Sequence, residues 1–380
     1  MSYDKNLFKE VIVDGRTGPS TFIVPHRYTD ITYISAGAQG TVVKAYDTVT
    51  EKHVAIKKLH NPFVTKLNAK HTYREFVLIA TMRHVNLIGL DYAFSPQSDL
   101  KDFNEIYLVM KFMDYNLSSL IAMMKINNTN LSYFTYQMVT AMNYMHRSGI
   151  IHRDLKPSNI GVGNDCVLKI LDYGLARRIE TNERMSMYVV TRYYRAPEVI
   201  LGLPYTEKGV LDHFDVWSIG CILAEMITRR VLFPGSDRLD QWMKIVQVRG
   251  TPSEKFINSL EPHARRFVKS KSRFTPQNLE TIFPDSMFSQ QQNVHKELEA
   301  ASARDLLNQM LQIDPDERIG IREAVKHPFI RLWFRKDEWD TPLPENRYDP
   351  NTDTVERPLT EWKRNDYGLN FLLNLLKIAC

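Results

Sequence analysis

The run from His152 to Asn159, HRDLKPSN, restricts the possible folds of this chain more than any other feature, because it meets the pattern H-R-D-L-x-x-x-N at every fixed position. In that arrangement an aspartate takes the proton of a hydroxyl that attacks a phosphoryl group, a lysine steadies the transferred group, and an asparagine holds Mg²⁺. A polar loop that carries these letters by chance is the competing interpretation. If the pattern is functional, Asp154 is the base, Lys156 assists the transition state and Asn159 binds Mg²⁺.

Two further segments lie in the order that the first one requires. Downstream, the apolar strand of KILDYG ends in Asp172, a second candidate Mg²⁺ ligand, although D-F-G is the usual wording. Upstream, the alternation of VAIK directs Lys57 to one face of a strand, where Glu75 of the next helix can hold its ammonium group. Alone, Lys57 and Glu75 would form an ordinary solvated surface pair. The order lysine, glutamate, HRD and DYG along the chain argues against both a chance polar loop and a solvated surface pair.

The chain changes from strands to helices after its first third, which predicts an α+β protein. Short β-branched segments between turn residues predict strands over residues 31–34, 40–46 and 52–59, then a helix over 70–82 and strands near 90 and over 106–112. Helical spacing predicts helices over residues 132–147, 215–228, 237–249 and 302–311. We place the boundary between a β-rich lobe and an α-rich lobe at residues 113–116.

Composition and charge limit the cellular compartment and the classes of partner that we expect for the protein. The 380 residues carry a formal net charge of +5 without a basic stripe, so direct binding to nucleic acid is not expected. The three cysteines, Cys166, Cys221 and Cys380, are widely spaced, which indicates a reducing compartment and no structural zinc. The most apolar stretch, residues 216–228, contains a glutamate and is too short to span a bilayer. We expect a monomer of the cytoplasm and nucleus without membrane association.

Together the motifs resemble those of the eukaryotic protein kinases, and they continue through the APE of residues 196–198 and the DVWSIG of residues 215–220 to Arg318. The resemblance implies the bilobal kinase fold, in which Glu198 pairs with a buried Arg318 and Asp215 braces the catalytic loop. The segment VVTRYYRAPE resembles the mitogen-activated protein kinases, and GAQG, YRE and LIGL resemble their Jun N-terminal kinase group. The chain is identified as a divergent member of the stress-activated branch.

The resemblance implies an ATP- and Mg²⁺-dependent protein serine/threonine kinase that acts before proline. It covers about residues 25–340 and implies an N-terminal extension (1–25), an N-lobe (26–113), a C-lobe (114–330) with an activation loop (172–198) and an insert (about 251–298), and a docking region and extension (331–380) that packs on the body. Asp114 either reaches the ribose or lies in a solvent-facing turn. The expected nucleotide site comprises Ile34, Ser35, Ala36, Gly37, Ala38, Gln39, Gly40, Val42, Ala55, Lys57, Glu75, Met110, Met113, Asp114 and Leu171.

Three positions in and around the expected nucleotide site depart from the family's pattern. Ser35 replaces the first glycine of the phosphate loop, but a strand-like φ there carries no penalty, so the loop should still work. Lys111 replaces a glutamate between the lobes, where backbone groups bind adenine. Gly161 stands where the family has an apolar side chain under the adenine ring, which predicts a wider floor and a loss of about 1 kcal/mol in ATP binding. Alternatively, a backbone shift or Leu171 fills the gap.

The resemblance also implies a phosphorylation switch in the lip SMY, with Ser186 and Tyr188 as the modified residues. Arginines would order the two phosphates, and solvated surface arginines are the alternative. The pocket for the first phosphate corresponds to Arg74, Arg153 and Arg177, and that for phosphotyrosine to Arg192 and Arg195.

A docking groove for basic peptides is the last feature that the resemblance implies. Arg335 stands where the first acidic residue of the groove is expected, so basic motifs should bind less tightly than in the relatives. The implied partners are an upstream dual-specificity MAP kinase kinase, transcription-factor substrates with basic docking motifs, and a MAP kinase phosphatase. The groove would comprise Asn164, Asp165, Asp337, Glu338 and Asp340.

A catalytically weak scaffold with the kinase fold is the main competing function. Every residue that the chemistry needs is present, which argues against it. A metabolite kinase or P-loop NTPase is less plausible still, because the chain has no G-x-x-x-x-G-K-[ST] segment and the lip over residues 192–198 resembles a feature of kinases with peptide substrates. The apolar end over residues 371–378 is expected to pack on the body rather than on a membrane or a partner.

Overall fold

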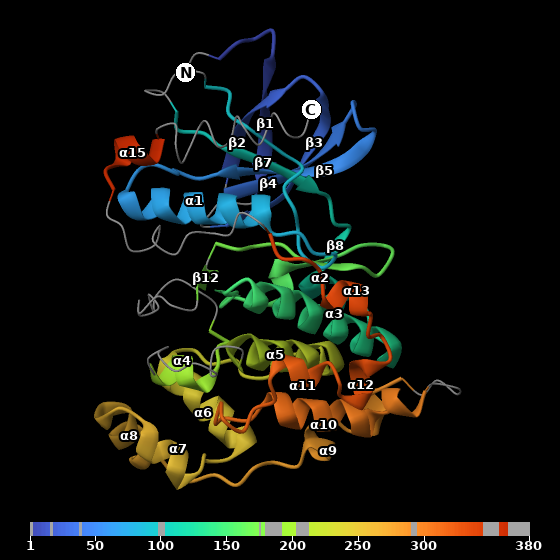
Figure 1. The fold of residues 1–380 in the computed structure, drawn as a ribbon, viewed down its shortest axis with the longest axis vertical. Helices are drawn as coiled ribbons and strands as arrows, with labels where there is room; N and C mark the ends of the chain where they lie inside the picture. Colours follow the sequence, from blue (N-terminus) through green and yellow to red (C-terminus); the bar gives the residue numbers. More distant parts are fainter. Residues whose placement is uncertain are drawn as a thin grey trace.

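The computed structural model describes residues 3–15, 18–37, 40–97, 103–174, 176–178, 192–202, 213–289, 295–344 and 357–363. A β-rich lobe lies above a helical lobe, so the predicted bilobal α+β fold is confirmed (Figure 1). The chain passes from one lobe to the other between strand β7 (Tyr107–Lys111) and helix α2 (Leu117–Met123). Each described helix is too short or too polar to span a membrane.

The upper lobe is built on a five-stranded antiparallel sheet with the order β3-β4-β5-β7-β6. Its other strands are β3 (Tyr28–Gly37), β4 (Gly40–Asp47), β5 (Lys52–Leu59) and β6 (Tyr92–Phe94). Along β5 the side chains alternate between two cores: Val54 and Ile56 pack in one, and Ala55 packs in the other. This alternation places Lys57 on the same face as Ala55, toward the helix that covers the sheet.

An N-terminal hairpin covers the other face of this sheet, and sequence reasoning treated it only as an extension. Strand β1 (Phe8–Gly15) pairs with β2 (Gly18–Pro25) through the whole of both strands. Phe22 is fully buried, and the backbone N–H of Ile23 donates to the hydroxyl of Tyr107 at 3.1 Å. The hairpin therefore belongs to the core of the upper lobe.

Helix α1 (Lys66–Thr81) lies beside the sheet, on the side of the lower lobe (Figure 1). It begins four residues before the predicted start, because the Thr65 hydroxyl caps it by accepting a hydrogen bond from the N–H of Asn68 at 3.0 Å. The buried stretch Arg74–Ala80 includes Glu75, the predicted partner of Lys57.

The lower lobe is centred on two buried helices, α3 (Asn128–Arg147) and α5 (His213–Thr228), which pack on each other. Trp217 of α5 is fully buried and stacks on Phe233. Helix α6 (Arg238–Arg249) begins after Asp237, whose carboxylate caps it, and α10 (Ala300–Met310) packs on α5. All four predicted C-lobe helices are present within a few residues of their expected bounds.

Short elements complete the lower lobe. The strands are β8 (Tyr115–Asn116), β9 (Ile150–Ile151), β10 (Ile160–Val162), β11 (Leu168–Ile170) and β12 (Arg177–Arg178). The helices are α4 (Pro197–Leu201), α7 (Glu254–Ser259), α8 (Pro262–Lys269), α9 (Leu279–Ile282), α11 (Ile321–Ala324), α12 (Pro328–Arg331) and α13 (Lys336–Trp339), with 3-10 turns at Pro157–Asn159, Asp285–Met287 and Lys296–Leu298.

A C-terminal segment returns to the upper lobe. Helix α15 (Leu359–Lys363) packs on α1, where the Trp362 ring lies 5.5 Å from that of Tyr73 and is buried (Figure 1). The contact ties the extension to the helix that carries Glu75. The apolar end over residues 371–378, predicted to pack on the body, lies outside the described residues.

Candidate active site

The catalytic loop is held by one buried carboxylate of α5. Asp215 accepts hydrogen bonds from the backbone N–H groups of His152 and Arg153, each at 3.0 Å, and its Oδ2 lies 2.7 Å from Nε2 of His146. Burial opposes ionisation of Asp215, but the His146 hydrogen bond and the nearby His152 outweigh it and lower the pKa. Arg153 has a left-handed φ of 70°, a strained conformation that these bonds fix. The predicted brace is present.

Asp154 lies at the centre of the loop, between a cation and an amide. Its Oδ2 accepts from Nζ of Lys156 at 2.7 Å and from Nδ2 of Asn159 at 3.1 Å. Burial raises the pKa of Asp154, although Lys156 and His152 counter part of the effect. A partly buried carboxylate with a raised pKa, held by two donors, can take the proton of an incoming hydroxyl.

Across the cleft, Lys57 of β5 forms a buried ion pair with Glu75 of α1. Burial opposes the charge of Lys57, but Glu75 and Asp172 outweigh it and raise the pKa of the ammonium group. Asp172 is held by the N–H of Gly174, which donates to Oδ1 at 2.9 Å. Burial also opposes the negative charge of Asp172, but the attraction of the Lys57 cation outweighs this effect and lowers the pKa of Asp172. The site therefore combines a fixed cation with an ionised carboxylate.

The tyrosine that replaces phenylalanine after Asp172 is a buried anchor. Tyr173 is 1% exposed, and its hydroxyl donates to the backbone carbonyl of Ile88 at 2.9 Å. Because that hydroxyl has a partner, its burial carries no unpaired polar group. The departure from D-F-G therefore adds a bond between this segment and the loop after α1.

The oxygen atoms that Asn159 and Asp172 offer near Asp154 are suitable ligands for a hard divalent cation. The amide nitrogen of Asn159 is engaged by the carbonyl and carboxylate of Asp154, each at 3.1 Å, which leaves its oxygen as the ligand atom. Asp172, whose charge acts on Asp154, supplies ionised oxygen atoms nearby. Within the described ranges, His, Cys, Asp and Glu nowhere gather in a group of three that could hold a metal alone. Two protein ligands fit Mg²⁺, which keeps water and phosphate oxygens in its remaining positions.

The glycine loop is the turn between β3 and β4. Ser35 pairs with Val42, Ala36 with Thr41, and Gly37 with Gly40. Ser35 therefore has the strand conformation that makes a missing glycine tolerable there. Ile34 precedes the loop on β3, whereas Ala38 and Gln39 at its tip lie outside the described residues.

The predicted wider floor of the nucleotide site is wrong, because another side chain occupies the space. A Cβ atom added to Gly161 would lie 2.6 Å from Cγ of Met113 and 3.1 Å from Cδ2 of Leu171. Met113, from the connection between the lobes, therefore takes the place of the missing branched residue, with Leu171 beside it. The alternative prediction, that Leu171 fills the gap at Gly161, is correct only in part, because Met113 lies closer.

Two other residues of the lobe connection have definite positions. Met110 is 7% exposed and pairs with Ala55 in the sheet, as a residue at the back of the site should. Asp114 is exposed, and its Oδ2 accepts from the N–H of Asn164 at 3.0 Å. Asp114 thus supports the loop after β10, which agrees with a turn role.

Strand pairing places one of the predicted phosphate-binding arginines near the catalytic loop. β12 pairs with β9, which sets Arg177 opposite Ile151, close along the chain to Arg153. Arg74 is buried on α1. Ser186, Tyr188 and the side chain of Arg177 lie outside the described residues.

The segment before α4 is fixed by a contact that sequence reasoning missed. The hydroxyl of Tyr194 donates to Glu225 Oε2 at 2.6 Å, and the Ser218 hydroxyl donates to the carbonyl of Tyr194 at 2.8 Å. Burial raises the pKa of Glu225. On the other side, Arg192 donates to the carbonyl of Ser236 at 2.5 Å. The signal was available as the one acidic residue in an otherwise apolar stretch over residues 216–228.

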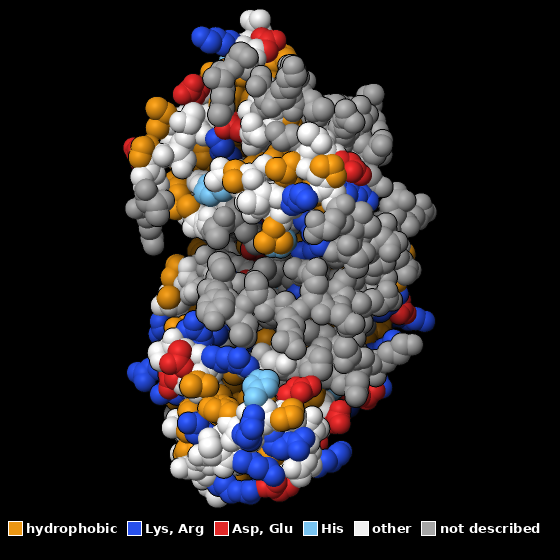
Figure 2. Space-filling view, turned by 90° about the vertical axis from the view of Figure 1, so that its left-hand side faces the viewer, with side chains coloured by type: hydrophobic (Ala, Val, Ile, Leu, Met, Phe, Trp, Pro, Cys, Tyr) orange, Lys and Arg blue, Asp and Glu red, His pale blue; other side chains and the backbone are white. Residues whose placement is uncertain are grey.

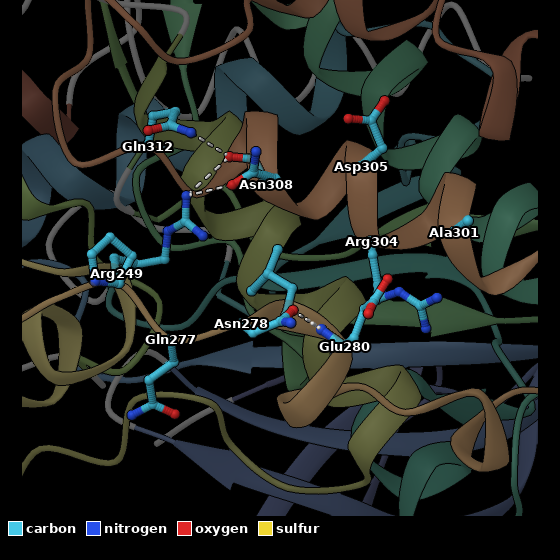
Figure 3. A pocket seen from close by; sticks show the side chains of 11 residues that line it. Arg249, Gln277, Asn278, Glu280, Ala301, Arg304, Asp305, Asn308 and Gln312 are labelled. Carbon is cyan, nitrogen blue, oxygen red and sulfur yellow. Dashed lines mark hydrogen bonds between the residues drawn. The ribbon is translucent and has the colours of Figure 1, made fainter.

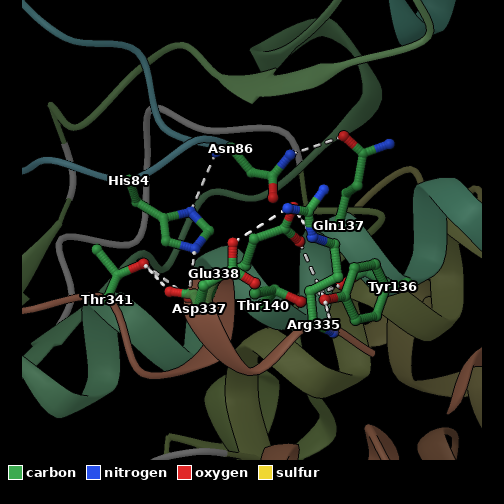
Figure 4. Close-up of polar contacts among 9 residues, drawn as sticks. All are labelled: His84, Asn86, Tyr136, Gln137, Thr140, Arg335, Asp337, Glu338 and Thr341. Carbon is green, nitrogen blue, oxygen red and sulfur yellow. Dashed lines mark hydrogen bonds and ion pairs between the residues drawn. The ribbon is translucent and has the colours of Figure 1, made fainter. Parts of the chain in front are cut away.

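Two of the predicted docking residues, Asp337 and Glu338, lie with Arg335 beside Tyr136 of α3 (Figure 4). Arg335 donates to Asp337 at 3.1 Å and lies 3.5 Å from Glu338, while the Tyr136 hydroxyl donates to Glu338 at 3.0 Å. Asn164 and Asp165 follow β10. Burial raises the pKa of the Tyr133 hydroxyl, and the negative charges of Glu338 and Asp165 raise it further. Asp340 follows α13 and is exposed. Of the three acidic residues over residues 337–340, Asp337 and Glu338 are therefore engaged by the chain's own arginine.

A separate hollow of about 510 Å³ lies between the end of α6, residues 276–280 and α10 (Figure 3). Its arginines are already engaged: Arg249 donates to the carbonyl of Leu311 at 2.8 Å, and Arg304 to that of Phe283 at 2.9 Å. None of the catalytic residues lines it. It is therefore not the active site.

The chain is similar in sequence to known protein kinases. Residues 28–330 match the family model described as the protein kinase domain. The chain is 50% identical over 366 residues to GLH-binding kinase 1 of Caenorhabditis elegans, which covers 95% of this chain and 93% of that protein. It is 48% identical over 350 residues to the stress-activated protein kinase JNK of Drosophila melanogaster, 92% of each. The chain belongs to the protein kinase family, as a serine/threonine kinase of the JNK-like mitogen-activated group.

Proposed function

We propose that this kinase transfers the γ-phosphoryl group of Mg-ATP to serine or threonine before proline, within a stress-activated cascade. The observation that carries the proposal is the contact of Asp154 with Lys156 at 2.7 Å and Asn159 at 3.1 Å, opposite the Lys57–Glu75 pair. This arrangement supplies a base, a cation for the transferred group and a ligand for the metal. Direction by proline rests on likeness to the JNK group through residues 191–195.

Each residue has a distinct role in the proposed reaction. Asp154 accepts the proton of the substrate hydroxyl, and Lys156 neutralises charge on the group in transit. Lys57, held by Glu75, orients the α and β phosphates. Asn159 and Asp172 would hold Mg²⁺, which when bound neutralises phosphate charge. The glycine loop covers the nucleotide.

Activation is proposed to require phosphates on Ser186 and Tyr188, which would bridge arginines of both lobes. Arg74 on α1 and Arg153 in the catalytic loop support this, because a phosphate bound to both would link Glu75 to Asp154. An upstream dual-specificity kinase would add the phosphates and a MAP kinase phosphatase would remove them. Action in both cytoplasm and nucleus is proposed on the same likeness.

The test is phosphate transfer from Mg-ATP to peptides that differ only in Ser-Pro or Ser-Ala at the acceptor. The chain is first treated with an activating dual-specificity kinase, and a Ser186→Ala/Tyr188→Phe variant receives the same treatment. We expect transfer to Ser-Pro alone, lost in that variant. Equal use of both peptides would exclude direction by proline, and full activity of the variant would exclude the switch. ATP binding without any transfer would favour the scaffold.

Replacing Gly161 with valine should weaken ATP binding, since the new side chain would collide with Met113. Overpacking costs 1–3 kcal/mol, so the Michaelis constant for ATP should rise about tenfold. A Gly161→Val/Met113→Ala variant should recover most of the loss. Gly320→Ala is the control, because a Cβ there meets no atom within 4 Å. An unchanged constant in Gly161→Val would show that Met113 moves aside freely.

Replacing Arg335 with glutamate should strengthen binding of basic docking peptides. The change frees Asp337 and Glu338 from their internal cation, and exposed charges act through water. We expect the dissociation constant to fall severalfold at low salt, and the gain to vanish near 1 M salt, where the Debye length is about 3 Å. Arg322→Glu, an exposed site on α11, serves as the control. Equal effects of the two variants would mean that only net charge matters.

A further inference from the structure

Most of the net charge of the chain lies in one surface segment. Residues 251–277 contain six Lys or Arg and two Glu, a net charge of +4, whereas the whole chain carries +5. Figure 2 shows Lys and Arg side chains gathered at the lower end of the molecule. The exposed members at α8 and just after it are Arg266, Lys269, Lys271 and Arg273, which we name the basic insert surface.

The basic insert surface is a preformed platform. Ala264 and Val268 of α8 are buried, so the opposite face of the helix, with Arg266 and Lys269, points to solvent. Arg265 fixes the preceding loop by donating to the carbonyls of Asn258 at 2.5 Å and Leu260 at 3.0 Å. The backbone under the exposed cations is therefore held before any partner arrives.

Internal acids neutralise this surface poorly. Glu254 is the acidic partner of both Arg273 and Lys269, the latter at 3.7 Å. Lys271 lies over the ring of Phe267 at 5.1 Å, and among the described residues no ion pair reaches Arg266. One carboxylate is thus paired with two of the four cations, and the excess positive charge is open to an external anion.

Helix α6 links this surface to the segment that receives the substrate. At its start, Arg238 donates to the carbonyl of Ile200 in α4, and Gln241 donates to that of Tyr193 at 3.4 Å. After the helix ends, α7 and α8 follow and pack on each other. Figure 1 shows α4, α6, α7 and α8 on the same side of the lower lobe. A bound protein that extends beyond the acceptor can pass over α6 and reach the cations.

The chemistry of the surface selects the class of partner. Within residues 251–289, all of which the structure describes, no large hydrophobic residue is exposed. The surface therefore has no apolar group to enter a bilayer and no free aromatic ring on which a base could stack. We propose that the basic insert surface binds an acidic segment of the protein substrate, on the carboxyl side of the phosphorylated residue.

This proposal rests on the proposed function. It also predicts a minimum spacing between the acceptor residue and the acidic segment of the substrate. Helix α6 has 12 residues, which at about 1.5 Å each span roughly 18 Å. An extended chain advances at most about 3.6 Å per residue, so at least about five residues must separate acceptor and acidic segment. The carboxyl direction follows because Arg192 and Tyr193, of the segment on which the proposed direction by proline rests, are bonded to Ser236 just before α6 and to Gln241 in its first turn.

The test compares peptides that share one Ser-Pro acceptor and a neutral spacer of about eight residues. One peptide then carries four glutamates, the second four glutamines, and the third has the glutamates directly after the acceptor. KM and kcat are measured for the activated chain, for an Arg266→Glu/Lys269→Glu/Lys271→Glu variant, and for a Lys5→Glu/Lys52→Glu/Arg322→Glu control. The control reverses three exposed cations elsewhere and so changes the net charge equally.

We expect the spaced glutamate peptide to have a KM about tenfold below that of the glutamine peptide, as three exposed ion pairs would give. The difference should vanish in the insert variant, persist in the control, and shrink as salt rises. An equal KM for the spaced and adjacent glutamates, or an unchanged preference in the insert variant, overturns the proposal. Loss of phosphatidylserine vesicle binding in that variant, without any peptide preference, would instead assign the surface to membranes. If the glutamine peptide is not phosphorylated at all, the proposed function itself fails.

Discussion

Replacing Arg318 with alanine is expected to lower the free energy of unfolding by about 3–5 kcal/mol, the range for removing one partner of a buried ion pair. The two terminal nitrogens of Arg318 donate to the two oxygens of Glu198 at 2.7 and 2.9 Å. The side chains are 0% and 2% exposed, so water cannot replace the lost cation. Glu198 would remain as a buried carboxylate without its partner.

Arg318 also holds neutral groups, which increases the expected loss. It donates to the carbonyls of His213 at 2.7 Å and Gln312 at 2.9 Å, and its guanidinium lies 5.1 Å from the centre of the Trp217 ring. These contacts join α4, the start of α5 and the segment after α10. Alanine would remove the donor from both of these partly buried carbonyls.

Chemical denaturation measures the effect. Arg273→Ala is the matched control, because Arg273 pairs with Glu254 at the surface and its loss should barely move the midpoint. If Arg318→Ala does not fold, an Arg318→Met/Glu198→Leu variant tests the same physics, since removing both charges should restore much of the stability. Equal midpoints for Arg318→Ala and Arg273→Ala would mean that the buried pair contributes nothing.

Local patterns were enough to predict much of this fold. The alternation along Val54–Lys57 is visible in the sequence, and the sheet has β5 over Lys52–Leu59 as expected. The helical spacing around Val216 likewise predicted α5. These elements were predictable because a single face or a single periodicity decides their burial. The contacts of Asp154 with Lys156 and Asn159 were predictable for a different reason, since all three residues belong to one continuous segment.

The features that were missed depend on contacts between distant segments. The N-terminal hairpin is stable because Phe22 and Val24 pack in the core that also contains Tyr107, which no local pattern reveals. Met113 fills the space above Gly161 although 48 positions separate them, and glycine alone indicated only missing volume. The Tyr194–Glu225 bond could be suspected from a glutamate in an apolar helix, but its partner could not be named.

Replacing Asp154 with asparagine is expected to lower kcat by about two to four orders of magnitude, the range for losing a positioned base. Asparagine keeps the shape, and its oxygen can still accept from Lys156, but it cannot take a proton at neutral pH. ATP affinity should therefore stay unchanged while transfer stops. Asp316→Asn, at an exposed position, is the control. A variant that keeps kcat within about threefold of the parent would remove Asp154 from the base role.

The pH dependence of kcat checks that Asp154 is the group that titrates. Burial raises the pKa of Asp154, so kcat should already fall at a pH above the usual range of an aspartate, because protonation removes the base. Lys156 lowers that pKa through its hydrogen bond at 2.7 Å. Lys156→Met should therefore move the acidic limb to higher pH, in addition to lowering kcat. If the limb does not move, or persists in Asp154→Asn, another group limits the reaction, and the geometry around Asp154 serves binding rather than proton transfer.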